Sequence, residues 1–357
     1  MSLYPVVKLL PNRVRRNYLG GRSIDEMQGI PSPSDSDKPE EWVGSLIPAR
    51  NYGLEEIENE GYSKFQDNGK QELLKTLIEQ NPDYYLGKAY YEAKGLDFGF
   101  LFKILDSSMR LHVQAHPTAE FAQKYLESKY GKMECYYILK VREGTNGYIR
   151  LGFQHLPTKK EWKRIIEEQD IKAMDSCFEK VPVKEGEVWY VPGGVPHAIG
   201  ENVMVLEIME PSDLVVRCEF ERNGIVVPPK ARFMGKGLDF CLNIFEYKER
   251  DLKTIRETFK VLPVTIKKES NYTFNRLIDA SIAKSFLVYH LALKEGNFKL
   301  EKGSSFMVTL VVKGEVSIND DITLTKGESA FLSASSGNIN IKAKQKDCEV
   351  CFVAPVN

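Results

Sequence analysis

The sequence has no long hydrophobic run and almost no net charge. None of its 357 residues lies in an uninterrupted apolar stretch of about 18 residues, the length that suggests a membrane-spanning helix. The N-terminus also lacks the apolar segment and cleavage site of a signal peptide. The 49 Lys and Arg residues are balanced by 50 Asp and Glu residues, for a net charge of −1, so the overall charge favours neither nucleic acid nor an anionic membrane. We therefore expect a cytoplasmic protein that binds neither, and local charge must meet any anionic ligand.

Cysteine is scarce, with six residues scattered along the chain. Cys348 and Cys351 have CxxC spacing, but no second pair accompanies them, so zinc or redox chemistry there is disfavoured. A chain of this length can build a sizeable core without covalent staples. We expect the cysteines to be small buried apolar residues.

Histidine is scarcer still, and two of the five histidines lie in the short run MRLHVQAHP, residues 109–117. If this run is a strand, His112, Gln114 and His116 leave the same face and point into one space. A metal ion or a polar ligand would explain such a face, whereas an apolar core would not.

Short segments of strand character dominate the chain, separated by Gly, Asn or Asp turns, and after about residue 280 the pattern is strand throughout. The expected strands before that point are 99–107, 109–116, 133–141, 186–194, 201–210 and 213–220. Many short strands with regular turns are typical of β-sandwiches and jelly rolls. We divide the chain into a domain of residues 1–245 and a domain of residues 246–357.

Three helices are expected among the strands of the first domain. One covers 70–82, closed by Pro82. Another covers 118–131, with Gly131 as its C-cap. The third covers 158–170, where Thr158 and Glu161 have the spacing of a capping box.

A second informative stretch is GEVWYVPGGVPHAIGEN, residues 186–202. It predicts a strand, a sharp turn, and a histidine delivered from the rim of the next strand. The order Gly-x5-Pro-x-Gly-x2-His, from Gly186 to His197, resembles the second metal-binding motif of the cupin superfamily. The asparagine of that motif falls one position late, at Asn202.

The run LFKILDSSMRLHVQAHP, followed by GKMECYYIL and then by the PGGVPH turn, resembles the type I phosphomannose isomerases. These are zinc-dependent jelly-roll enzymes, and the resemblance extends to YLGG near residue 18, EEWVGS, SDLVVR and the C-terminal strands. It implies a mainly β fold of cupin jelly rolls with a few inserted helices. The first jelly roll is expected to bind metal, and the C-terminal jelly roll is not. It also implies interconversion of mannose 6-phosphate and fructose 6-phosphate through an enediol.

Nine residues acquire roles through this resemblance. The implied ligands of one Zn2+ per chain are Gln114, His116, Glu134 and His197. The implied catalytic residues are Arg217 and Lys132, and the implied substrate-binding residues are Lys103, His112 and Asp213.

The chemistry of these residues agrees with a metal site but does not choose the metal. Zinc accepts imidazole, carboxylate and, less often, amide ligands, and a catalytic site keeps one position open. A shell of two histidines, a glutamine and a glutamate also suits iron or manganese. An always-charged guanidinium stabilises an anion better than it removes a proton, so Arg217 is assigned to the enediolate or the phosphate. The base stays open among Lys132, Glu134 and Asp213.

His112 departs from the resembled family, which usually has a serine close to the substrate phosphate. An imidazole there allows a phosphate-facing or supporting role, a metal ligand, or a different sugar substrate. Two further alternatives stay open: a metal cupin acting on another sugar phosphate, and a sugar-phosphate-binding cupin without turnover. An iron-dependent oxygenase is disfavoured because HVQAH lacks the HxH pattern of such enzymes. The sequence does not indicate the oligomeric state.

Overall fold

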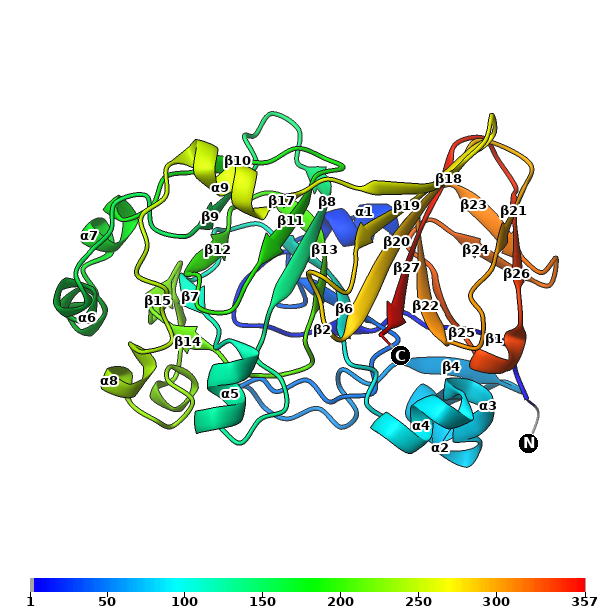
Figure 1. Ribbon diagram of the computed structural model, residues 1–357, viewed down its shortest axis with the longest axis horizontal. Helices are drawn as coiled ribbons and strands as arrows, with labels where there is room; N and C mark the ends of the chain where they lie inside the picture. The colour runs from blue at the N-terminus through cyan, green and yellow to red at the C-terminus, as the bar shows by residue number, and fades with distance from the viewer. Residues whose placement is uncertain (1–2, 357) are drawn as a thin grey trace.

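The computed structural model describes residues 3–356, which form two antiparallel β-sandwiches side by side (Figure 1). The first sandwich pairs a seven-stranded sheet with a five-stranded sheet. In spatial order, the seven strands are β17 (Lys260–Val261), β11 (Val188–Val191), β8 (Glu134–Val141), β13 (Val203–Met209), β6 (Leu101–Ser107), β3 (Glu40–Val43) and β2 (Arg13–Val14). The five strands are β10 (Val181–Pro182), β9 (Tyr148–Leu151), β12 (His197–Ile199), β7 (Gln114–Ala115) and β14 (Val216–Arg217).

The second sandwich pairs a seven-stranded sheet with a four-stranded sheet. The seven strands are β1 (Val6–Lys8), β25 (Ser329–Leu332), β22 (Met307–Lys313), β27 (Cys348–Pro355), β20 (Phe286–Leu293), β19 (Tyr272–Ile278) and β18 (Val264–Lys268). The four strands are β21 (Asn297–Leu300), β26 (Ile339–Ala343), β23 (Glu315–Ile318) and β24 (Ile322–Thr325). Two hairpins complete the strands: β4 (Lys64–Asp67) with β5 (Lys70–Leu73), and β15 (Glu221–Arg222) with β16 (Ile225–Val226). The expectation of a mainly β fold is confirmed.

The helices are short and lie outside the sheets (Figure 1). They are α1 (Arg22–Met27), α2 (Leu74–Gln80), α3 (Pro82–Leu86), α4 (Lys88–Lys94), α5 (Ala119–Tyr125), α6 (Lys159–Glu168), α7 (Ile171–Ser176), α8 (Leu238–Cys241) and α9 (Leu252–Phe259), with single 3-10 turns at Pro229–Ala231 and Ala334–Ser336. Among residues 3–356, no helix has the length and apolarity needed to cross a membrane.

The two sandwiches share one large core, because apolar side chains from both seven-stranded sheets meet there. Phe102, Ile104 and Leu206 of the first sandwich lie in the same buried cluster as Val288 and Val353 of the second. Separate apolar clusters fill the interior of each sandwich. The chain also crosses between them: β1 pairs with β25, and β17 pairs with β11. The division at residues 245 and 246 stays a prediction.

Several expected elements differ in the structure. The helix expected over 70–82 is shorter, because Lys70–Leu73 pairs with β4 as β5 and α2 begins at Leu74. Pro82 does not close a helix but opens α3, where its missing N–H costs no intrahelical bond. The helix expected over 118–131 ends at Tyr125. Gly131 is not its cap: a Cβ there would lie 2.5 Å from the Pro117 carbonyl oxygen, so close packing requires glycine.

The strand expected over 109–116 is wrong for most of its length, since only Gln114 and Ala115 join a sheet. At Val113 a side chain takes the place of a strand partner, because the Val113 amide donates to the Glu219 carboxylate at 2.6 Å. Arg110 holds the same carboxylate with two bonds of 2.6 and 2.8 Å. The helix expected over 158–170 is α6, and Thr158 and Glu161 form the predicted capping box.

All six cysteines are buried and free, as expected. Cys348 and Cys351 both lie on β27 but belong to different apolar clusters, one inside the second sandwich and one between the sandwiches. Residues three apart in a strand leave opposite faces, so this CxxC pair does not form a ligand pair.

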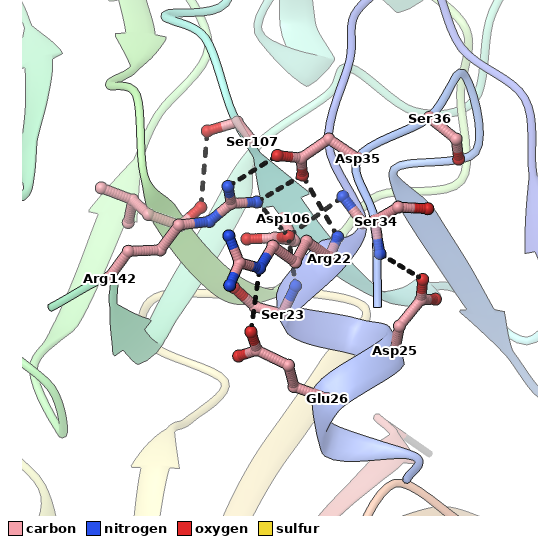
Figure 2. Close-up of polar contacts among 12 residues, drawn as sticks. Arg22, Ser23, Asp25, Glu26, Ser34, Asp35, Ser36, Asp106, Ser107 and Arg142 are labelled. Carbon is pink, nitrogen blue, oxygen red and sulfur yellow. Dashed lines mark hydrogen bonds and ion pairs between the residues drawn. The ribbon is translucent and has the colours of Figure 1, made fainter. Parts of the chain in front are cut away.

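A polar network fixes the N-terminal segment to the first sandwich (Figure 2). Asp106, at the end of β6, accepts the backbone amides of Gly21 at 3.0 Å and Ser23 at 2.8 Å. Arg142 contacts this carboxylate at 2.7 Å and reaches Asp35 in the Pro/Ser/Asp loop. The YLGG motif belongs to this junction, because the Gly21 amide donates to Asp106. Gly21 has φ +100°, a backbone conformation that favours glycine.

Glu41 makes the stability of this fold depend on pH. Its side chain is buried on β3, one oxygen accepts the Asn12 amide at 2.5 Å, and the other has no hydrogen-bond partner. Burial raises the pKa of this carboxyl to about 7. A group whose pKa is higher in the folded than in the unfolded state stabilises the fold fully below its unfolded pKa, about 4.3, and that contribution is lost as the pH rises through about 7.

We predict that Glu41→Gln, which keeps an acceptor oxygen and cannot ionise, is more stable than the wild type at pH 8 by on the order of 2 kcal/mol. At pH 4.5 the two proteins should differ much less. Chemical denaturation at both pH values measures this, with Glu328→Gln as the control, because the Glu328 carboxylate is ion-paired with Lys8 at 2.7 Å. An equal difference at both pH values would contradict the assignment.

Candidate metal centre

His116, Glu134 and His197 converge from three strands of the first sandwich. His116 follows β7, Glu134 begins β8 and His197 begins β12. One potential ligand atom from each lies within 4.8 Å of the others, and all three side chains are buried. Gln114 is paired with His197 in register, and its Nε2 lies 3.5 Å from Nε2 of His197.

Two backbone carbonyls fix how the histidine rings present their nitrogens. Nδ1 of His116 lies 2.9 Å from the Leu214 carbonyl oxygen, and Nδ1 of His197 lies 2.9 Å from that of Val195. A carbonyl can only accept, so each Nδ1 carries a proton and each ring turns its Nε2 toward the centre. Burial, with the nearby charge of Lys132, lowers the pKa of His116 to about 3, which keeps that ring neutral.

The carboxylate of Glu134 points toward Nε2 of both His116 and His197. Its buried Oε1 lies 3.0 Å from Nε2 of His116 and, apart from an ion pair with Nζ of Lys132 at 3.2 Å, has no hydrogen-bond partner. Its Oε2 lies 3.5 Å from Nε2 of His197. Burial opposes ionisation, but the Lys132 ammonium beside the carboxylate outweighs it and holds the pKa of Glu134 well below its usual range. A buried carboxylate facing imidazole lone pairs fits a divalent cation, and this donor set is one that zinc accepts.

The Pro-Gly-Gly turn before His197 holds the two histidine segments together. A Cβ on Gly193 would lie 2.6 Å from the Pro117 carbonyl oxygen. Gly194 has φ +89°, and its amide donates to the His116 carbonyl at 2.6 Å. Both glycines are needed, the first for close approach and the second for its left-handed backbone.

Lys132 and Lys103 occupy different surroundings. Nζ of Lys132 lies 3.2 Å from Oε1 of Glu134 and 3.5 Å from Nε2 of His116, so this lysine is at the centre. Nζ of Lys103, on β6, lies 3.1 Å from Glu207 and 3.6 Å from Glu40. Burial raises the pKa of Glu207 to about 7.

Sequence reasoning missed Glu40 and Glu207. For Glu207 a signal was present, because it is the only charged residue of β13. Glu40 also accepts hydrogen bonds from the Tyr18 hydroxyl at 2.6 Å and the Trp42 indole at 2.7 Å. A buried carboxylate with this many donors is a fixed part of the local charge pattern.

Arg217 lies beside the centre, since β14 pairs with β7 and places Arg217 opposite Gln114. It lines a cavity of about 440 Å³ together with Arg16 and Arg50. Its Nη1 donates to the Ala231 carbonyl at 2.6 Å. Burial and the charge of Arg16 lower the pKa of Arg217 to about 10.

His112 and Asp213 lie outside the three-residue cluster. Burial, with the charge of Arg217, lowers the pKa of His112 to about 4, and its Nε2 is buried without a hydrogen-bond partner. Asp213 is exposed, with an oxygen 3.8 Å from Nε of Arg50. The expectation that His112 shares one strand face with Gln114 and His116 fails because the strand does not extend back to residue 112.

Two antiparallel sandwiches with a buried His/Glu/His cluster define a metal-site protein of the cupin class. Residues 17–137 match the family model of the phosphomannose isomerase type I catalytic domain, and residues 279–351 match that of the mannose-6-phosphate isomerase cupin domain. Together the two matches cover more than half of the chain. The chain belongs to the type I phosphomannose isomerase family.

One relative and two solved structures match the chain over nearly its whole length, and a second relative matches about a third of it. A mannose-6-phosphate isomerase of Streptococcus mutans is 25% identical over 349 residues, which is 97% of this chain and 96% of the relative. The mannose-6-phosphate isomerase ManA of Bacillus subtilis is 36% identical over 126 residues, 35% of this chain and 38% of the relative. In fold, the chain is similar to a crystal structure of the Bacillus subtilis mannose 6-phosphate isomerase, with a TM-score of 0.72 and 23% identity over 98% of this chain and 99% of that one. A zinc-bound mannose 6-phosphate isomerase gives a TM-score of 0.73 with 16% identity over 99% and 100%.

We predict that the purified protein binds one equivalent of Zn2+ and that His116→Ala weakens binding more than about 100-fold, because one of the few available ligands is lost. Isothermal titration after chelation and dialysis measures the affinity. His155→Ala is the matched control, since this exposed histidine is 3.7 Å from Glu179 and outside the centre. Equal zinc affinity in both variants would rule out the cluster as the site.

Proposed function

We propose that this chain is a zinc-dependent aldose–ketose isomerase that interconverts mannose 6-phosphate and fructose 6-phosphate. The convergence of His116, Glu134 and His197 carries the proposal, because their buried ligand atoms lie within 4.8 Å of one another and two imidazoles with a carboxylate are a donor set that zinc accepts. Family membership supports the choice of reaction. The expected cytoplasmic location stays a prediction.

His116, Glu134 and His197, with Gln114, would hold the metal. A divalent cation at this position supplies Lewis-acid stabilisation of the negative charge that develops on the sugar oxygens. The reaction removes a carbon-bound proton next to a carbonyl and returns it to the adjacent carbon through an enediol.

Lys132 is the group we assign to proton handling in this reaction. Its Nζ is beside Glu134 and His116, so it lies next to the place where the reacting carbons would be held. Glu134 is engaged by these neighbours, and Asp213 lies at the surface beside Arg50. Glu134 and Asp213 therefore suit the role of base less well than Lys132 does.

The arginine-lined cavity is the proposed place of the phosphate group. Arg16, Arg50 and Arg217 bring three guanidinium groups to it, and guanidinium matches the geometry of phosphate oxygens. Burial first, and then the charge of Arg16, lower the pKa of Arg217, and a bound anion would offset both effects. His112, neutral and next to Arg217, can hydrogen-bond the same phosphate. Lys103 stays a predicted substrate-binding residue, for which Glu40 and Glu207 compete.

We predict that the protein converts mannose 6-phosphate to fructose 6-phosphate, that chelation abolishes this activity, and that added Zn2+ restores it. His197→Ala should lose activity by at least about 1,000-fold, since both metal and geometry are lost. A coupled assay for fructose 6-phosphate measures turnover. Zinc binding without turnover on this substrate would refute the proposed reaction and favour a different sugar phosphate or a binding role.

We also predict that Arg217→Met and Arg50→Met act on different kinetic constants. Arg217 is half-buried and lies opposite Gln114, so its loss should lower kcat by about 100-fold or more, as does loss of one donor that stabilises a developing anion. Arg50 is at the exposed side of the cavity, and its loss should raise KM by about 3- to 10-fold with little change in kcat. Steady-state kinetics on both variants distinguish the roles, and a reversal of this pattern would refute them.

A further inference from the structure

Tyr136 holds the second oxygen of Glu134. The two residues are two apart on β8, so their side chains leave the same face of the strand. The Tyr136 hydroxyl donates to Oε2 of Glu134 at 2.5 Å, and both side chains are almost completely buried. Neither the family resemblance nor the motif at residues 109–117 pointed to this tyrosine.

The hydrogen bond gives the two carboxylate oxygens of Glu134 different surroundings. Oε2 accepts the hydrogen bond of the Tyr136 phenol, whereas Oε1 faces Nε2 of His116 at 3.0 Å and Nζ of Lys132 at 3.2 Å. A carboxylate that rotates freely could exchange its oxygens, and a donor fixed on one of them stops this rotation. Oε1 is thereby kept aimed at the centre of the cluster.

The phenol is itself held rigidly. Its ring packs in the apolar interior of the first sandwich with Trp189, Leu105 and Ile138. An ordinary phenol, with a pKa of about 10, is protonated throughout the neutral range. The hydroxyl therefore acts as a donor to Glu134.

We propose that Tyr136 is a positioning residue that sets metal affinity by orienting Glu134 as a ligand, and that it keeps this carboxylate from acting as the base. The proposal rests on the metal site of the proposed function but not on the sugar that is turned over. Groups that orient a metal ligand typically contribute 10- to 100-fold to affinity or activity.

Tyr136→Phe and Tyr137→Phe make a matched pair of variants, since each removes one phenol hydroxyl from neighbouring positions of β8. Tyr137 leaves the opposite face, belongs to the core between the sandwiches, and has its ring 5.6 Å from that of His290. Competition with a chromophoric chelator gives the zinc dissociation constant of each protein. The visible absorption of the Co2+-substituted forms reports ligand geometry without any assay of activity.

The proposal expects Tyr136→Phe to bind zinc about 10- to 100-fold more weakly and to shift the Co2+ spectrum, while Tyr137→Phe stays within about twofold of the wild type. Wild-type affinity and spectrum in Tyr136→Phe would overturn it. If Tyr136→Phe folds poorly by circular dichroism, the same comparison is made with Tyr136→Trp, whose indole N–H retains a donor. A folded Tyr136→Trp whose zinc affinity lies close to wild type supports the proposal, and one that binds more than 100-fold more weakly overturns it.

A double-mutant cycle separates positioning from packing. In a Glu134→Gln background, Tyr136→Phe should cause little further loss of zinc affinity, because the carboxylate that it orients is already gone. Additive losses would overturn the proposal. A wild type that binds zinc but does not isomerise mannose 6-phosphate would refute the proposed reaction alone, whereas a wild type that binds no zinc would refute both.

Discussion

A buried carboxylate oxygen that faces an unprotonated imidazole nitrogen at 3.0 Å is the contact around which the first sandwich is organised. Removing one partner of a buried charge pair typically costs about 3–5 kcal/mol, so an arrangement with unmet charge is not neutral to the fold. It persists because its surroundings fix it. The Leu214 and Val195 carbonyls fix the rings, and the Pro-Gly-Gly turn fixes the segments that carry them. The hydrogen bonds and packing of these surrounding groups stabilise the fold and hold the ligand atoms of the cluster close together. A preorganised cation site requires such an arrangement.

The seven-stranded sheet of the first sandwich supports this centre with two unlike faces. Across the sheet, Lys103, Glu207 and Tyr136 are opposite one another on adjacent strands. Their neighbours along each strand, such as Phe102 and Ile208, leave the other face and pack against the second sandwich. Strand alternation therefore separates a row of buried polar groups from a mainly apolar interface. The second sandwich buries the outer face of the seven-stranded sheet of the first sandwich. Within residues 3–356, the only cluster of three potential His, Cys, Asp or Glu ligands lies in the first sandwich.

The strand pattern could be predicted from the sequence because it depends on local order, whereas the ligand set was implied by the family resemblance. The capping box of α6 and the turn before His197 need residues only a few positions apart. The role of residues 109–116 could not be predicted in this way. Alternation suggested one strand face, but Glu219, more than 100 residues later, takes the Val113 amide and ends the ladder. Glu40 and Glu207 were missed for a related reason, since their partner Lys103 comes from a third strand and no spacing within one segment reveals it.

The site has two poles of opposite chemistry that are joined by the register of one small sheet. His197 on β12 is opposite Gln114 on β7, and Gln114 is opposite Arg217 on β14. The acceptor cluster at one end demands a cation, and the guanidinium groups at the other end demand an anion. A ligand that satisfies both ends must carry oxygens for a metal and a separate negative group, as a sugar phosphate does. His112 is a neutral group near the second pole, because burial and Arg217 both disfavour its protonation. An imidazole can therefore replace a hydroxyl there and still donate a hydrogen bond to the anion without adding a further positive charge.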